Sequence, residues 1–476
     1  AGGHIGSTKG ENGLPNRSQL ELKRDLGLWG AVAIVIGTVI GSGIFLVPKR
    51  ALLKVGDPWE LFFVWVFGGL LSLAGALTYA ELAAAMPESG GEYVYLKAAY
   101  GRLYAFIYGW TQMWVAKSGS CATLATAFYL AMVNFVPGLN AVIARIDAPI
   151  GPNWQPLEIT AGQIVAILLI LGLGGVNYFG VKFGGGVQLV VTIAKVALFA
   201  AIIGIGFSFS GGTVSHMNTS VPANPGGVAG FFAALVGILW AYDGWNNVSM
   251  VSAEIQNPQK NLPKALILGT LAVMAIYLAA NAAYFYVLTA DEVVKADLVP
   301  AGVMRKIFGP VGATAVSVVA MVSIFAALNG SILTGARVPF AMARDGLFFK
   351  SFGEVHPEYR SPGVSIFGLS AWSCVLVLSG RYDELYTCVI FASWILYGMA
   401  AASVIVLRRT QPDLPRPYRT LGYPLVPMVF VLVAGLLIFY TLRDSPRESI
   451  LGLGLIALGL PFYFHWNRKN SLASRT

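Results

Sequence analysis

The sequence has few charged residues, few cysteines and few histidines, and each shortage excludes a class of protein. Only 12% of its 476 residues are charged, whereas about 25% is usual in soluble domains. The three cysteines, Cys121, Cys374 and Cys388, all lie in apolar runs, so we expect neither a disulfide framework nor a cysteine metal site. The four histidines lie in loops or near the ends of the chain. We therefore expect no metal and no cofactor.

Hydrophobic residues are abundant instead, at 56% of the chain, and the mean hydropathy is +0.68. The strands of a membrane barrel would alternate apolar and polar residues over about 10 positions. A spanning helix needs about 20 mainly apolar residues, and the apolar runs here have that length. The sequence predicts an all-α polytopic membrane protein. Its twelve predicted transmembrane helices are 28–47, 60–83, 102–134, 160–180, 186–208, 228–252, 264–290, 311–343, 364–380, 385–407, 423–442 and 449–466.

The net charge of +9 would suggest nucleic acid in a soluble protein. In a polytopic membrane protein it indicates basic cytoplasmic loops, so we expect a lipid bilayer and no nucleic acid as partner. With the N-terminus inside, the inner segments hold about twice as many Lys and Arg as the outer ones. The tails 1–26 and 467–476 are therefore predicted to be cytoplasmic, in a multi-pass protein of the plasma or inner membrane.

The first span is interrupted by GTVIGSGIF, from Gly37 to Phe45. Glycine costs a helix about 1 kcal/mol relative to alanine, and irregular backbone at membrane depth needs protein or a watery cavity around it. An unwound segment would leave N–H groups free, and the half-helix after it would turn its positive end toward an anion such as a carboxylate. The alternative is a packing face of small residues.

The sixth span is interrupted in the same way by AYDGWNN, from Ala241 to Asn247. Paired interrupted helices in matching places of two halves indicate a transporter site, which favours the unwound interpretation of both. The two breaks are five spans apart. Because five is an odd number, a second set of five spans would cross the membrane in the opposite direction to the first set. The predicted division is one repeat in 27–208, a second in 228–410 and two further helices in 411–466.

Four stretches carry a family resemblance: GTVIGSGIF, AELAAAMPESGGEYVYL, WAYDGWNNVSMVSAEIQNPQKNLPKAL and NGSILTGARVPFAMARDG. Together they resemble the amino acid–polyamine–organocation superfamily, and within it the L-type amino-acid transporters, over about residues 22–465. The resemblance implies a LeuT-like five-plus-five inverted repeat with helices 1 and 6 unwound. It also implies sodium-independent amino-acid exchange by alternating access.

The heteromeric members of that family carry a cysteine in the external loop between spans three and four. That loop has none here, so we expect no disulfide-linked heavy chain, and the stand-alone bacterial members are the nearer relatives. Neutral L-amino acids are the expected substrates. The alternatives are a proton-coupled symporter, also accepting cationic amino acids, and a sensor that binds without transport. An ion channel and an enzyme are disfavoured, because neither a pore filter nor a catalytic cluster is visible.

The substrate groups are assigned from the helix breaks and from the resemblance. Ser42, with the backbone of Gly41 and Gly43 and with Ile40 close by, is predicted to hold the α-carboxylate. The carbonyls of Trp240 and Ala241 are predicted to accept from the α-ammonium. Trp240 is preferred over Tyr242 as the aromatic gate. The remaining predicted contacts of the substrate side chain are Gly119, Ser120, Phe391 and Ser393.

Three ionisable residues, Asp243, Lys195 and Lys117, lie near the middle of predicted spans. For Asp243 three roles stay open: attracting a cationic group, pairing with Lys117 or Lys195, or capping the second half-helix. In sodium-independent relatives a lysine at the place of Lys195 stands where sodium would bind, so it is predicted to contact the carbonyls near Gly37 and to reach Ser331 or nearby groups. It would be a fixed charge, which is preferred, or a proton carrier. Lys117 has no assigned role.

Three acidic residues are predicted to form exposed pairs near the cytoplasmic side that tune the conformational balance. The expected pairs are Glu81 and Glu88 with Arg102, and Glu254 with Arg337 or Arg344. Exposed pairs of this kind contribute about 0–1 kcal/mol.

Overall fold

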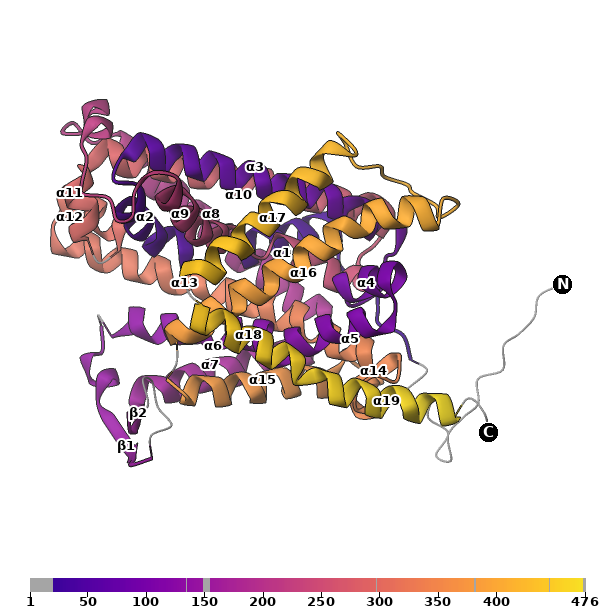
Figure 1. Cartoon of the computed structure of the whole chain (residues 1–476). Coiled ribbons are helices and arrows are strands. Elements are labelled where there is room, and N and C mark those ends of the chain that lie inside the picture. Colours follow the sequence, from indigo (N-terminus) through magenta and orange to yellow (C-terminus); the bar gives the residue numbers. More distant parts are fainter. Residues whose placement is uncertain are drawn as a thin grey trace.

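The computed structural model describes residues 20–133, 135–148, 155–296, 298–380, 382–444 and 446–473, and most of them are helical (Figure 1). The α-helices are α1 (Leu28–Val39), α2 (Gly43–Val55), α3 (Pro58–Ala85), α4 (Glu92–Tyr100), α5 (Arg102–Thr111), α6 (Lys117–Met132), α7 (Ala161–Tyr178), α8 (Val181–Phe207), α9 (Gly227–Tyr242), α10 (Pro258–Val287), α11 (Ala290–Lys295), α12 (Val299–Phe308), α13 (Pro310–Gly335), α14 (Arg337–Arg344), α15 (Gly363–Leu378), α16 (Tyr382–Thr410), α17 (Leu425–Asp444), α18 (Pro446–Ala457) and α19 (Gly459–Ala473).

Short elements complete the described chain. A π-helix, η1 (Gln112–Ala116), joins α5 to α6, and 3₁₀ turns form η2 (Pro137–Asn140), η4 (Val214–Asn218), η5 (Trp245–Glu254) and η6 (Lys350–Gly353). The strands β1 (Val142–Ile146) and β2 (Leu157–Thr160) pair antiparallel, with an irregularity between Val142 and Ala144.

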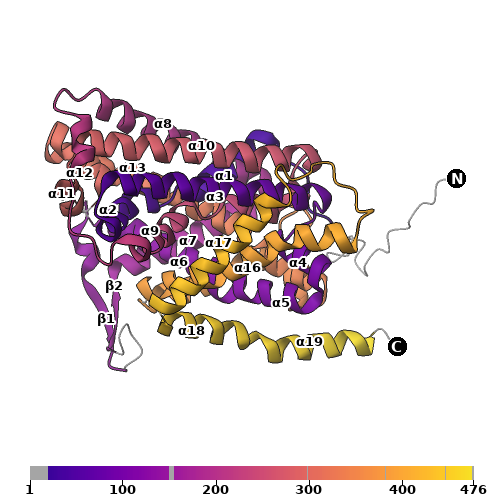
Figure 2. The ribbon, with the colours of Figure 1, turned by 45° about the horizontal axis from the view of Figure 1, so that its top comes forward.

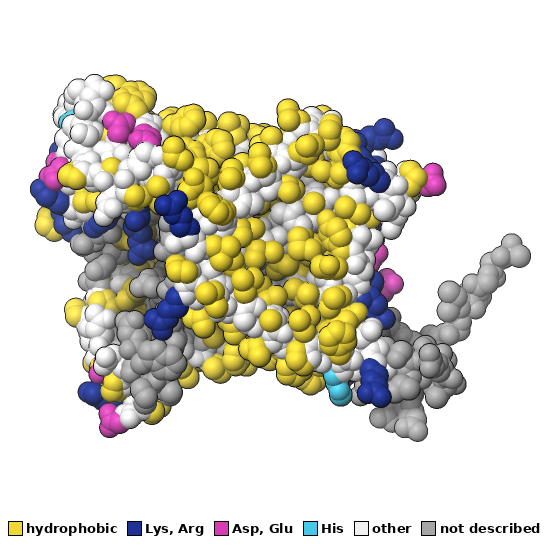
Figure 3. Space-filling view, in the orientation of Figure 1, with side chains coloured by type: hydrophobic (Ala, Val, Ile, Leu, Met, Phe, Trp, Pro, Cys, Tyr) yellow, Lys and Arg dark blue, Asp and Glu magenta, His cyan; other side chains and the backbone are white. Residues whose placement is uncertain are grey.

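Within the described residues, nine helical segments are long and apolar enough to span a membrane, and the bent α1–α2 pair makes a tenth. The predicted third span is the uninterrupted run of α5, η1 and α6, and the predicted ninth is the 16-residue helix α15. The all-α membrane architecture is confirmed, whereas the number twelve stays a prediction. Figure 3 shows an apolar surface between two ends that carry charged side chains, as a bilayer requires.

The two ends of the molecule differ. One end, here called the α11–α12 end, also carries β1 and β2, and the opposite end, called the α4–α14 end, also receives the end of α19 (Figure 1). Turns at these ends follow ordinary sequence rules. Gly56, at a φ of +83°, terminates α2. Asp57 then caps α3 by accepting from the Glu60 N–H at 2.9 Å, ahead of Pro58 at the first helical position.

Both predicted helix breaks are present. The axes of α1 and α2 differ by 42° across Ile40–Ser42. Between α9 and η5, Asp243 is extended and Gly244 has a φ of +107°, which favours glycine. The second break is narrower than AYDGWNN, because the chain resumes as 3₁₀ turns at Trp245. Figure 2 shows α1 beside α10, and α1 also contacts α8 and η5, so both breaks are enclosed by helices.

Candidate functional site

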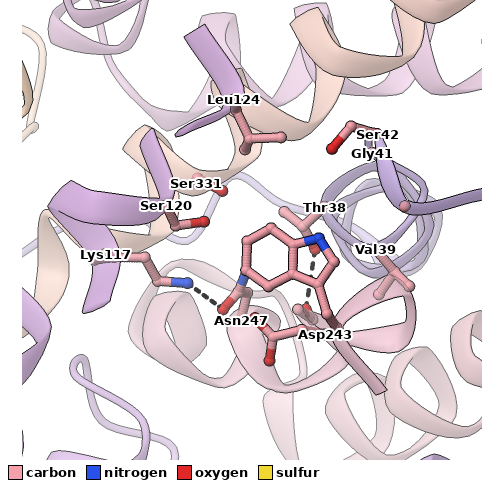
Figure 4. Close-up of a pocket in the computed structure, with 13 residues that line it drawn as sticks. Thr38, Val39, Gly41, Ser42, Lys117, Ser120, Leu124, Asp243, Asn247 and Ser331 are labelled. Atoms are coloured by element: carbon pink, nitrogen blue, oxygen red, sulfur yellow. Dashed lines mark hydrogen bonds between the residues drawn. The ribbon is translucent and has the colours of Figure 1, made fainter. Parts of the chain in front are cut away.

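A cavity of about 30 Å³ lies where the two helix breaks meet (Figure 4). Four helical regions contribute to its wall: the α1–α2 break, α6, the α9–η5 break and α13. Its lining residues are Thr38, Val39, Gly41, Ser42, Gly43, Lys117, Ser120, Leu124, Trp240, Asp243, Gly244, Asn247 and Ser331. Helix breaks five spans apart in the sequence therefore share one small, mostly polar space.

The carbonyls released by the first break are satisfied from α8 and α13. The Lys195 ammonium is fully buried and donates to the carbonyl of Gly37 at 2.9 Å and to that of Ile40. The Ser323 hydroxyl donates to the Ile40 carbonyl at 2.8 Å. The expected contact of Lys195 with Gly37 is present. Within the described residues no hydrogen bond joins Lys195 to Ser331: Ser323 of α13 reaches the same Ile40 carbonyl, while Ser331 lies two turns further on and lines the cavity.

Two further hydroxyls join the breaks to each other. Tyr277 of α10 lies 3.1 Å from the carbonyl oxygen of Val39 and 2.8 Å from that of Ala241. The Thr38 hydroxyl lies 3.0 Å from the carbonyl oxygen of Gly244 and 2.7 Å from that of Ile34 in its own helix, so its one proton is shared between these acceptors. A hydroxyl has one proton, so Tyr277 donates to one carbonyl at a time. The sequence did not indicate Tyr277, because it sits in a run of apolar residues with nothing to distinguish it from a core tyrosine.

Seven of the predicted site residues line the cavity: Gly41, Ser42, Gly43, Ser120, Trp240, Asp243 and Ser331. Thr38 and Asn247 line it as well and were not predicted. For Thr38 a sequence signal existed, since it lies inside GTVIGSGIF. Asn247 belongs to the quoted AYDGWNN motif, but the sequence alone assigned no role to its side-chain amide.

The other predicted residues lie beside the cavity or away from it. Ile40 and Ala241 are buried at the breaks, and Gly119 is buried next to Ser120. Tyr242 packs between Trp65 and Tyr277, with ring centroids 5.7 and 5.1 Å away. The last two, Phe391 and Ser393, are buried on α16, and Phe391 lines a separate cavity with Val236 and Trp394.

Close contact explains why residue 43 is glycine. A Cβ added to Gly43 would lie 2.7 Å from both the Cα and the Cβ of Ala241. The start of α2 can therefore approach the end of α9 only without a side chain at this position.

Asp243 accepts a hydrogen bond of 2.9 Å from the Tyr397 hydroxyl. Its backbone N–H donates to the Trp240 carbonyl at 3.1 Å, and Gly244, not Asp243, is the N-cap residue of η5. The capping role considered for Asp243 was thus wrong, because η5 starts one residue later than the cap would need. Within the described residues, Asp243 forms no ion pair within 4.0 Å with Lys117 or Lys195.

Lys117 enters the cavity from α6. Its ammonium donates to Asn247 Oδ1 (Figure 4) and its side chain is buried. Lys117 and Asp243 attract each other electrostatically across the cavity. The π-helix η1 immediately precedes Lys117, and such bulges often occur at functional sites.

A second cavity, of about 560 Å³, extends from Ser42 toward the α11–α12 end. Ser42 lines both cavities, so the central cavity adjoins the larger one. The walls of the larger cavity come from α2, α6, α12 and α13. Figure 3 shows the surface hollowed at this end, with basic side chains around the hollow.

The α4–α14 end is closed by polar contacts. Asp345 accepts from Lys97 at 2.7 Å and from the Tyr93 hydroxyl at 2.8 Å. The chain before α1 is attached to the end of η5, since the Leu26 N–H donates to the Glu254 carbonyl at 3.0 Å. Glu254 also pairs with Arg337 at 2.7 Å, and both side chains are fully buried.

The expected pairs at this end were partly wrong. Glu254 pairs with Arg337 as expected, but the pair is buried rather than exposed. Glu81 pairs with Arg408 and Arg416, not with Arg102, because α16 and the segment after it pass over the end of α3. Arg102 instead donates to the Asp345 carbonyl at 2.9 Å.

Comparison with known proteins agrees with this architecture. Residues 26–451 match the family described as "Amino acid permease". The chain is 33% identical to the serine/threonine exchanger SteT of Bacillus subtilis over 461 residues, which cover 94% of this chain and 98% of that protein. It is 31% identical to the mouse b(0,+)-type amino acid transporter 1 over 446 residues, covering 93% and 88%. It is 27% identical to the human cystine/glutamate transporter over 462 residues, covering 96% and 88%.

These matches extend over nearly the whole chain, and they confirm the family and the LeuT-like fold that the four motifs indicated. The chain, a multi-pass membrane protein with two unwound helices around a small polar cavity, belongs to the amino acid permease family.

Proposed function

We propose that the protein exchanges small neutral L-amino acids across the cell membrane by alternating access, without sodium. The observation that carries this proposal is the joining of two helix breaks in one cavity, with the start of α2 and the end of α9 on its wall. A zwitterion needs an anion site and a cation site a few ångströms apart. The ends of half-helices supply both.

The carboxylate site is the start of α2. The first N–H groups of a helix have no acceptor within the helix, and the positive end of the helix dipole favours an anion there. Ser42 adds a hydroxyl beside Gly43, and both residues line the cavity.

The ammonium site is the end of α9. The carbonyls of Trp240 and Ala241 already accept from the Asp243 N–H and from the Tyr277 hydroxyl. Each carbonyl oxygen has a second lone pair, which can accept a hydrogen bond from the substrate ammonium. Trp240 lines the cavity and is the proposed gate, whereas the packing of Tyr242 against Trp65 makes it a supporting residue.

Independence from sodium follows from the position of Lys195. Unwound carbonyls in such folds are the groups that coordinate a coupling cation. Here the buried ammonium already occupies the carbonyls of Gly37 and Ile40. Lys195 therefore acts as a permanent cation that keeps the first break in place.

The α4–α14 end is proposed to face the cytoplasm, together with the tails 1–26 and 467–476. The closed contacts at that end and the large cavity at the other correspond to a state that receives substrate from outside. The repeats 27–208 and 228–410 would then move against each other around the breaks, with 411–466 outside the repeats.

Small substrates are proposed because the central cavity is only about 30 Å³ and carries polar groups such as Ser120 and Asn247. The printed name of the Bacillus relative, a serine/threonine exchanger, agrees with substrates of this size. The loop between α6 and α7 lacks a cysteine, so we propose that the chain works without a disulfide-linked partner.

The test is exchange in liposomes that contain the purified protein. We expect uptake of labelled serine or alanine only when unlabelled amino acid is present inside, with no change when sodium is removed. Concentrative uptake into empty liposomes, driven by an inward proton gradient, would contradict exchange. It would instead support proton-coupled symport, which the carboxylate of Asp243 in the cavity wall makes the second candidate.

A further inference from the structure

Two ionisable side chains, one basic and one acidic, line the central cavity. Of its described lining residues, Lys117 and Asp243 alone are ionisable. They come from different helical segments, α6 and the α9–η5 break. A charge at this depth is costly in a membrane protein unless it has a partner or a function.

The two groups belong to one polar arrangement. Lys117 donates to Asn247 Oδ1, and Figure 4 shows Asn247 between Lys117 and Asp243. The distance between ammonium and carboxylate exceeds the 4.0 Å of an ion pair, but the groups attract each other electrostatically. Asp243 also accepts a hydrogen bond of 2.9 Å from the Tyr397 hydroxyl.

A third ionisable group lies nearby but outside the cavity wall. Glu92 also attracts Lys117. It is fully buried, and it accepts from the Tyr108 hydroxyl at 2.8 Å and from Asn246. Because it is absent from the cavity lining, a substrate side chain in the cavity meets the charges of Lys117 and Asp243 first.

We propose that Lys117 determines substrate charge: its ammonium offsets the Asp243 carboxylate, so that the cavity rejects cationic side chains and accepts neutral ones. This inference rests on the proposed amino-acid exchange and names the residue that limits its substrates. Without Lys117 the carboxylate would be the only charge in the cavity wall and would attract a second ammonium. Charges interact several times more strongly in such a site than in water.

The inference is tested by varying the two charges separately and together. Lys117→Gln, Asp243→Asn and the double variant are reconstituted with the wild type, and uptake of labelled lysine and serine is measured in parallel. We expect Lys117→Gln to raise the lysine-to-serine uptake ratio about tenfold or more. We expect the double variant to lose that gain, and Asp243→Asn alone to show no rise. Lys54→Gln is the matched control, since it removes an exposed lysine of α2 that does not line the cavity.

Binding is measured as well, because a variant that folds can still fail to turn over. The rise in melting temperature that lysine and serine cause in each detergent-solubilised variant compares the binding of the two amino acids without transport. If Lys117→Gln binds or transports serine but gains nothing for lysine, the inference is wrong. It is also wrong if the gain persists in the double variant. If the wild type exchanges no amino acid at all, the proposed function fails instead.

Discussion

The ammonium nitrogen of Lys195 on α8 lies 2.9 Å from the carbonyl oxygen of Gly37 on α1. The side chain is fully buried, and its nitrogen lies at the carbonyl end of a broken helix, which is the negative end of the helix dipole. Together with the contact of the same ammonium to the Ile40 carbonyl, the contact with Gly37 joins α8 to the end of α1 and to the unwound segment beside the central cavity. A change at Lys195 therefore acts on the geometry of the cavity without touching its wall.

We predict that Lys195→Gln lowers the exchange rate about tenfold or more, because an amide cannot replace a charge-assisted contact to two carbonyls. The measurement is serine exchange in liposomes with and without sodium. Lys182→Gln on the same helix is the control, since Lys182 is exposed. If Lys195→Gln exchanges at the wild-type rate, Lys195 has neither the fixed-charge role nor the proton-carrying role.

Gly43→Ala is predicted to abolish serine binding, because the added methyl group would overlap Ala241 and displace the start of α2. Adding Ala241→Gly should restore only part of the binding, since the Cα of Ala241 would still lie 2.7 Å from the new methyl. Gly186→Ala on α8 is the control, with no atom within 4 Å of an added Cβ. Binding is followed by thermal stabilisation with serine, and unchanged stabilisation of Gly43→Ala would exclude this close packing.

Tyr277→Phe is predicted to destabilise the protein by about 1–3 kcal/mol, because the buried carbonyls of Val39 and Ala241 lose the one hydroxyl donor that they share. Tyr284→Phe on the same helix is a matched control: its buried hydroxyl has no hydrogen-bond partner among the residues that the structure describes, so its removal should be neutral or stabilising. Melting temperatures in detergent give the comparison. Equal effects of the two substitutions would mean that Tyr277 does not join the breaks.

Glu254→Gln is predicted to destabilise the protein by about 3–5 kcal/mol, because it leaves the buried guanidinium of Arg337 without its anion. Asp291→Asn removes the acid of an exposed pair with Lys295 and should have no measurable effect on the melting temperature. An unchanged melting temperature for Glu254→Gln would show that the pair does not hold the α4–α14 end closed.

The sequence alone was enough to predict the membrane class, most of the helical spans and both helix breaks. The reason is that these depend on local properties: apolar runs of sufficient length, and glycine or polar residues where a membrane helix should continue. The boundaries of the second break were predicted too widely, because Trp245–Glu254 can form 3₁₀ turns that a composition pattern does not distinguish from irregular chain.

Only the tertiary structure decided which side chains meet at the breaks. Tyr277 and Ser323 look like ordinary residues of apolar helices until the packing of α10 and α13 brings their hydroxyls to the released carbonyls. Ser331 and Ser323 differ by two turns of one helix, and no local pattern says which turn faces Ile40. The sequence determined where backbone groups would be released, because that is a property of a single helix. The structure decided which groups satisfy them, because a hydrogen bond between helices depends on how the helices pack.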